Sequence, residues 1–261
     1  MSGGADKRGG VYRPGYTPRI RRFEIFSISI FALACGWTGW RLLPFADHET
    51  WLMVGAAALA YVGSDFTSGF VHWVFDTWGT PGTPLLGRPF IRPFREHHTD
   101  PLEITRHDFV ETNGNNCFIG TLPLIFALAI PLETGARFGI FAVTFLLWLV
   151  VFTMLTNQFH KWAHMPRPPR VVTWLQRIHL VLPPAHHALH HAHPYLRNYA
   201  ITVGWTNWLT DGVGVYRLLE WTLSRLTGAV PRRDDLGEVL AKQVAQQLDP
   251  ETKPMRDVLR S

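Results

Sequence analysis

The sequence is poor in cysteine: its 261 residues include only Cys35 and Cys117. The two lie far apart and form no C-x-x-C pair, so the sequence predicts neither a disulfide framework nor a dithiol redox motif. Zinc ribbons and cysteine-ligated iron–sulfur clusters are excluded for the same reason. This use of cysteine fits a reducing compartment.

Lysine is also scarce, although the formal net charge is +5 and the isoelectric point is near 9.5. Most of the 25 basic residues are arginines, which is typical of a GC-rich genome. These arginines flank apolar stretches and do not form a soluble basic face. Attraction to anionic lipid headgroups explains such a distribution, and we reject nucleic-acid binding.

Four apolar stretches, residues 23–40, 51–71, 117–132 and 138–159, each approach the roughly 20 residues that a bilayer-spanning helix needs. We therefore predict an all-α, polytopic membrane protein with about four transmembrane helices. The first stretch resembles a signal peptide, but no small-residue cleavage site follows it, so we expect it to be retained.

The polar remainder is expected to form a histidine-rich helical cap on one side of the membrane. Four crossings return the chain to its starting side, and the arginines cluster on that side, which by the positive-inside rule is the cytoplasm. We expect a basic tail over residues 1–22, the main domain over 23–235 and a C-terminal tail over 236–261. We expect the membrane to be a bacterial inner membrane, or the endoplasmic reticulum if the source is eukaryotic.

Histidines at close spacing are the strongest chemical signal. Residues four apart lie on one face of a helix, so His72 with Asp76, and His160 with His164, can reach one ion together. A closed zinc site needs about four ligands, and the chain offers more than twice that number, which favours two metal ions. The residues concerned are His72, Asp76, His97, His98, His160, His164, His186, His187, His190 and His191.

A polar stripe runs down the second apolar stretch at Asp65, Gly69, His72 and Asp76. An acid within a bilayer is costly, so Asp65 must face the protein interior or a wet cavity. It serves either a functional site or a hydrogen bond between packed segments, and the sequence leaves both open.

The segment from Phe90 to Cys117, FIRPFREHHTDPLEITRHDFVETNGNNC, resembles the signature of the plasmanylethanolamine desaturases. Residues 64–79, 157–164, 182–191 and 231–235 are similar to the same family. The resemblance begins at the second apolar stretch, and residues 1 to about 50 contribute little to it.

The resemblance implies a membrane enzyme that uses O₂ to convert the alkyl chain of an ether phospholipid into the vinyl ether of a plasmalogen. Redox-silent zinc cannot support that oxidation but two histidine-bound irons can. An external electron donor, of the cytochrome b5 type or ferredoxin-like, is implied as well. By residue, the match gives metal-ligand roles to His72, His97, His98, His160, His164, His187, His190 and His191. It makes Asp76 and His186 further ligands or supports of ligands, and His107 and His179 supports that orient ligands through their second ring nitrogen.

One departure and two alternatives remain. In the family pattern a histidine follows the proline after the last histidine block, whereas here Pro194 is followed by Tyr195 and preceded by His193. A different histidine-rich di-iron desaturase or hydroxylase acting on fatty acids would use the same residues. A metal or haem transporter is the less favoured alternative, because transport sites lie near the bilayer midplane. His48, far from the others, is expected to be merely exposed.

Overall fold

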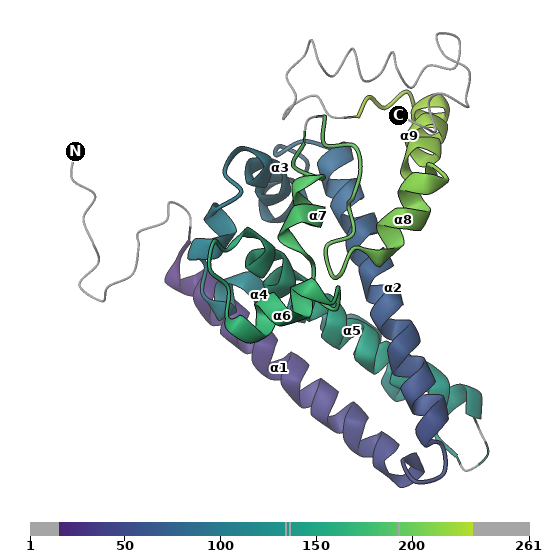
Figure 1. Ribbon diagram of the computed structural model, residues 1–261. Coiled ribbons are helices and arrows are strands. Elements are labelled where there is room, and N and C mark those ends of the chain that lie inside the picture. Colours follow the sequence, from purple (N-terminus) through teal and green to yellow (C-terminus); the bar gives the residue numbers. More distant parts are fainter. Residues whose placement is uncertain (1–15, 134, 136, 193, 232–261) are drawn as a thin grey trace.

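The computed structural model describes residues 16–133, 135, 137–192 and 194–231, and every regular element within these ranges is helical (Figure 1). Four long helices dominate: α1 (Pro18–Leu42), α2 (Thr50–Thr77), α4 (Phe109–Ala129) and α5 (Arg137–His164). They correspond to the four predicted apolar stretches, so the all-α prediction is confirmed. The predicted tail over 236–261 and His193 lie outside the described residues.

The largest difference in a boundary concerns α4, which begins eight residues before the predicted 117. Asp108 is its N-cap, and the Asp108 side chain accepts a hydrogen bond from the backbone N–H of Glu111. The first two turns are polar, which is why the hydropathy pattern missed them. These turns bring Glu111 and its neighbours into the region of the histidines.

The long helices pack through two small apolar clusters. Phe31, Cys117, Leu124 and Val150 join α1, α4 and α5, and both cysteines are free thiols. Close approach of α1 and α4 requires Gly114, because a Cβ there would lie 2.4 Å from Cβ of Glu24. The outward faces remain apolar, as Phe26 (60% exposed) and Phe126 (72% exposed) illustrate. Such surfaces are unusual in a protein surrounded by water.

Within the described part of the chain, two helical segments are long and apolar enough to cross a membrane: Pro18–Phe45 and α5, with mean hydropathies of 1.3 and 2.5. The first of them includes the short helix η1 (Leu43–Phe45). Polar side chains interrupt the apolar character of α2 and α4. Two candidate membrane-spanning segments are consistent with the membrane protein predicted from the sequence.

The shorter helices surround the histidine-bearing ends of the long ones (Figure 1). α3 and α8 contact α2, and η3 and α7 contact α5. In chain order the shorter helices are η2 (Gly87–Ile91), α3 (Arg92–Thr99), η3 (Glu103–Arg106), α6 (Arg170–Arg177), α7 (Pro184–Ala188), α8 (Trp205–Gly212) and α9 (Val215–Thr227).

The polar stripe of α2 is buried and binds the backbone of residues 199–206. The Asp65 carboxylate accepts hydrogen bonds from the N–H groups of Val203, Gly204 and Thr206, at 2.8–2.9 Å, and from the Thr206 hydroxyl. It thereby supplies acceptors at the start of α8, where backbone N–H groups have no partner within the helix. Of the two roles left open for Asp65, the structure supports the hydrogen bond between packed segments.

Two further residues of α2, Ser68 and Gly69, contact the same segment. Ser68 Oγ accepts from the N–H of Ile201 at 3.0 Å. Gly69 permits the close approach, since a Cβ at this position would lie 3.0 Å from the backbone N of Ala200. One face of α2 therefore fixes the backbone that follows the last histidines.

Candidate metal centre

The close-spaced histidines come from four parts of the fold that meet at one end of the molecule. His72 and Asp76 lie in the last turns of α2, His97 and His98 on α3, and His160 and His164 in the last turns of α5. The remaining three, His187, His190 and His191, lie on α7 and directly after it. Together they form two groups in which the ligand atoms lie within 4.8 Å of one another.

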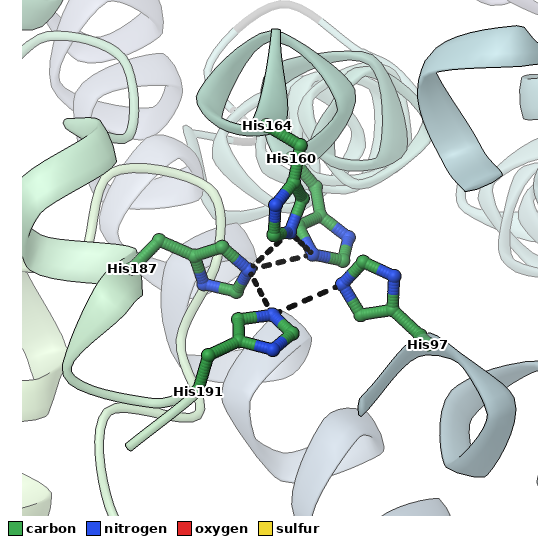
Figure 2. A group of neighbouring side chains, drawn as sticks. All are labelled: His97, His160, His164, His187 and His191. Carbon is green, nitrogen blue, oxygen red and sulfur yellow. Dashed lines mark hydrogen bonds between the residues drawn. The ribbon is translucent and has the colours of Figure 1, made fainter. Parts of the chain in front are cut away.

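The first group contains five histidines, His97, His160, His164, His187 and His191, whose rings converge in Figure 2. His187 is central: its Nε2 lies 2.8 Å from Nε2 of both His160 and His164, and 3.0 Å from Nε2 of His191. His97 completes the ring at 3.2 Å from His191. We refer to this as the five-histidine group.

The second group contains Asp76 and three histidines and is fully buried. Nε2 atoms of His72, His98 and His190 each lie 3.3 Å from Oδ2 of Asp76. We refer to this as the Asp76 group. The two groups are neighbours, because the rings of His72 and His160 are 6.0 Å apart and those of His187 and His190 are 5.7 Å apart.

The donor atoms fit metal ions better than they fit one another. Burial lowers the pKa of His97, His187 and His191, so these imidazoles are neutral at pH 7. A neutral imidazole carries one N–H, and five Nε2 atoms facing one point cannot all be satisfied by mutual hydrogen bonds. Ligands about 2.1 Å from a shared ion lie roughly 3 to 3.4 Å apart, which matches the observed separations.

Backbone carbonyls fix two rings of the Asp76 group. Nδ1 of His72 lies 3.0 Å from the carbonyl oxygen of Tyr199, and Nδ1 of His190 lies 2.9 Å from that of Arg197. Each Nδ1–H can donate there, which leaves the Nε2 lone pair directed at Asp76 and its neighbours. No side-chain pattern signals a backbone acceptor, so sequence reasoning missed both.

Tyr195, which departs from the family pattern, stacks on the ring of His98 at 4.6 Å and an interplanar angle of 6°. Its φ of +60° is uncommon for a bulky side chain. The position that departs from the pattern therefore contacts the metal centre directly.

Two other predicted site residues, His186 and His179, belong to neither group. His186 Nε2 is 3.0 Å from Nδ2 of Asn207, which also binds the backbone of Ala200. Burial lowers the pKa of His186, and the nearby His179 acts in the same direction. The structure thus places His186 among residues that hold the 199–206 segment. The role of Asn207 was not predicted from the sequence.

His107 lies at the edge of a cavity of about 300 Å³ that adjoins the five-histidine group. Its Nε2 is 3.8 Å from Oε1 of Glu103 and 3.7 Å from Oε1 of Glu111. Lys161 donates to the His107 carbonyl. His48 is exposed, as expected.

Comparison with known proteins identifies the family. A lipid desaturase domain matches residues 61–234. The chain is 47% identical to the plasmanylethanolamine desaturase of Myxococcus xanthus, over 89% of this chain and 82% of the relative. It is 40% identical to plasmanylethanolamine desaturase 1 of Mus musculus, over 89% of this chain and 86% of the relative.

A chloroplastic fatty acid desaturase of Arabidopsis thaliana, fatty acid desaturase 4-like 2, is 32% identical over 72% of this chain and 66% of the relative. No solved structure matches the chain significantly. The matches confirm the family resemblance seen in the histidine-bearing segments. They favour an enzyme over the hypothesis of a metal or haem transporter. The chain belongs to the lipid desaturase family.

Proposed function

We propose that this chain is a plasmanylethanolamine desaturase, which removes two hydrogens next to the ether oxygen of an alkyl ether phospholipid and forms a vinyl ether. The main support is the pair of adjoining donor groups, which together offer eight imidazoles and one carboxylate. The names of the relatives at 47% and 40% identity agree with this substrate.

The five-histidine group and the Asp76 group would each hold one iron. Two irons, with O₂ and an external reductant, supply the oxidising power to break unactivated C–H bonds, which zinc lacks. The reductant would come from a cytochrome b5 type or ferredoxin-like protein.

The side chains around the centre prepare it for this chemistry. His72, Asp76 and His190 are each 0% exposed, so water is excluded from the Asp76 group. Burial lowers the pKa of His187, and the neutral ring has one nitrogen whose lone pair can bind a metal. The Tyr199 and Arg197 carbonyls hold two rings in one orientation. A dry, preorganised site of this kind strengthens electrostatic interactions with whatever binds there.

In the membrane, all four long helices would span the bilayer, with the two donor groups at the cytoplasmic interface. The arginine bias supports this orientation. Leu102, between α3 and η3, and Arg170, the first residue of α6, are exposed and would lie on the same side. Cysteines introduced at these positions should react alike with an impermeant label in intact cells or vesicles. Labelling from opposite sides would refute the four-span arrangement.

The reaction is tested by mass spectrometry of lipids from cells that express the chain and are fed an alkylglycerol. We expect an acid-labile, aldehyde-releasing vinyl ether with the wild type and none with His98→Ala, which removes a donor of the Asp76 group. Purified wild-type protein should contain two irons. His48→Ala, an exposed control, should retain iron and activity. A double bond within an acyl chain would indicate the fatty-acid alternative.

A further inference from the structure

The cavity of about 300 Å³ is built where α1, α3, η3, α4 and α5 meet. Of the nine residues in the two donor groups, only His97 and His160 line it. The cavity therefore opens on the five-histidine group and gives access to one side of the metal centre. Whatever occupies it lies next to the atoms that would hold an iron.

The lining combines apolar and polar surfaces. Phe94, Ile104 and Ile201 contribute apolar walls, and Asn115, Asn116 and Asn157 contribute carboxamides. Nδ2 of Asn157 donates to the Thr112 carbonyl at 3.1 Å, and a carboxamide has a second N–H that can donate to a ligand. A volume of about 300 Å³ lies at the small end for ligand sites, so it holds part of a lipid and not a whole alkyl chain. The carbons next to an ether oxygen adjoin the glycerol, so the polar end of the lipid must accompany them.

One wall of the cavity is acidic. Glu103 and Glu111 both lie close to Nε2 of His107. Glu24, only 2% exposed, accepts a hydrogen bond from the Tyr16 hydroxyl at 2.6 Å. All of these residues line the cavity. An ionised carboxylate accepts several hydrogen bonds, so Glu103 and Glu111 can serve a ligand in addition to His107.

Two neighbouring arginines pair with carboxylates outside the cavity, and one of them, Arg21, also donates to the Tyr16 hydroxyl in its lining. Arg21 pairs with Asp108, and Arg106 pairs with Asp100, both at 2.5 Å. Neither aspartate lines the cavity. The cavity therefore has net acidic character beside its apolar surface, which suits a ligand that carries a cation on a polar head and an apolar chain behind it.

We propose that this cavity binds the phosphoethanolamine end of the substrate, with Glu103 and Glu111 receiving the ammonium group. The carboxamides of Asn115, Asn116 and Asn157 donate to oxygens of the phosphate and glycerol. Headgroup binding there brings the first carbons of the alkyl chain to the side of His97 and His160. This inference rests on the proposed function and names the groups that select the headgroup.

The test compares two alkyl ether phospholipids in detergent with purified, iron-loaded enzyme. One has an ethanolamine headgroup and the other a phosphomethanol headgroup, which lacks the cation. The variant is Glu103→Gln with Glu111→Gln, which keeps shape and hydrogen bonding but removes both charges. Charge-assisted hydrogen bonds are worth enough to predict a rise of about tenfold or more in KM for the ethanolamine lipid. We expect the preference for the ethanolamine lipid over the phosphomethanol lipid, measured as the ratio of their kcat/KM values, to fall with it.

Asp47→Asn is the control, because it removes an exposed carboxylate that follows η1, at the end of α1 away from the cavity. It should preserve the wild-type preference for ethanolamine. Iron content and thermal unfolding of the double variant, equal to those of the wild type, establish that it is folded. If the wild type makes vinyl ethers but the double variant keeps the ethanolamine preference, the headgroup site is wrong and the proposed function stands. A wild type that desaturates neither lipid refutes the proposed function itself.

Discussion

The two donor groups are neighbours but differ in composition, burial and support. The five-histidine group has no carboxylate, adjoins a cavity, and includes two half-buried members, His164 and His191. The Asp76 group has a central carboxylate and is fully buried. Backbone carbonyls hold two of its three rings, those of His72 and His190, whereas Nδ1 of His187 and of His191 has no hydrogen-bond partner among the described residues.

This difference indicates a division of labour. A group fixed by the backbone and closed to solvent keeps one geometry, whereas a group beside a cavity can be approached by other molecules. We infer that substrate and O₂ reach the metal centre through the cavity beside the five-histidine group. The Asp76 group would then hold its metal ion without direct contact with the cavity. The comparison makes separate predictions for the two groups.

The largest effect is expected for His187→Ala. His187 contacts three of the other four members of its group through Nε2, at 2.8–3.0 Å, so its loss removes the central donor. Loss of residues that only support metal ligands already costs about 10–100-fold. We expect activity to fall at least about a hundredfold and iron content to drop from two to one per chain, measured by metal analysis of purified protein.

The remaining iron of His187→Ala should belong to the Asp76 group. Adding His190→Ala should therefore remove it, while His190→Ala alone should leave the iron of the five-histidine group. If His187→Ala lost both irons, or neither, the two groups would not be separate sites.

A smaller effect is expected for Gly69→Ala, which acts on the support of the Asp76 group. The added Cβ would lie 2.8 Å from Oη of Tyr216 and 3.0 Å from the backbone N of Ala200. The segment must shift, and with it the Tyr199 carbonyl that orients His72. Overpacking of this kind costs about 1–3 kcal/mol, so we expect lower thermal stability and weaker retention of one iron.

Gly55→Ala is the matched control on the same helix, since a Cβ there meets nothing within 4 Å. Alanine favours helix over glycine by up to about 1 kcal/mol, so Gly55→Ala should not reduce stability. Equal behaviour of the two variants in thermal unfolding would show that the contact between α2 and residues 199–206 does not support the site.

Much of this arrangement follows from local sequence pattern. Apolar length predicted the four long helices, and i, i+4 spacing predicted the pairs His72 with Asp76 and His160 with His164. The division into two groups was not predictable, because the adjacent residues His97 and His98 enter different groups. Adjacent residues on a helix point about 100° apart, so which partner each meets depends on tertiary packing.

The support of the site was harder to predict than its ligands. His186 was predicted to be a ligand or a support of a ligand, and Asp65 to serve either a functional site or a hydrogen bond between packed segments. In the structure both bind the segment 199–206 or its partner Asn207. Burial and hydrogen-bonding demand select histidine and aspartate in both settings. For Asp65 the segment lies 138 residues later in the sequence at Val203, so only tertiary packing decides whether such a residue binds a metal or supports the backbone near it.

The smallest effect is a difference in the rate at which a chelator removes the two irons. The five-histidine group adjoins the cavity and has half-buried members, whereas His72, Asp76 and His190 are 0% exposed. A chelator that enters through the cavity should remove the iron of the five-histidine group several-fold faster. Release of iron should then be biphasic when followed spectroscopically in detergent, and His187→Ala should abolish the fast phase alone.

An ether phospholipid in the cavity should slow the fast phase and leave the slow phase unchanged. Release in a single phase, or protection of both phases by the lipid, would show that the two groups are equally accessible and that burial does not distinguish them.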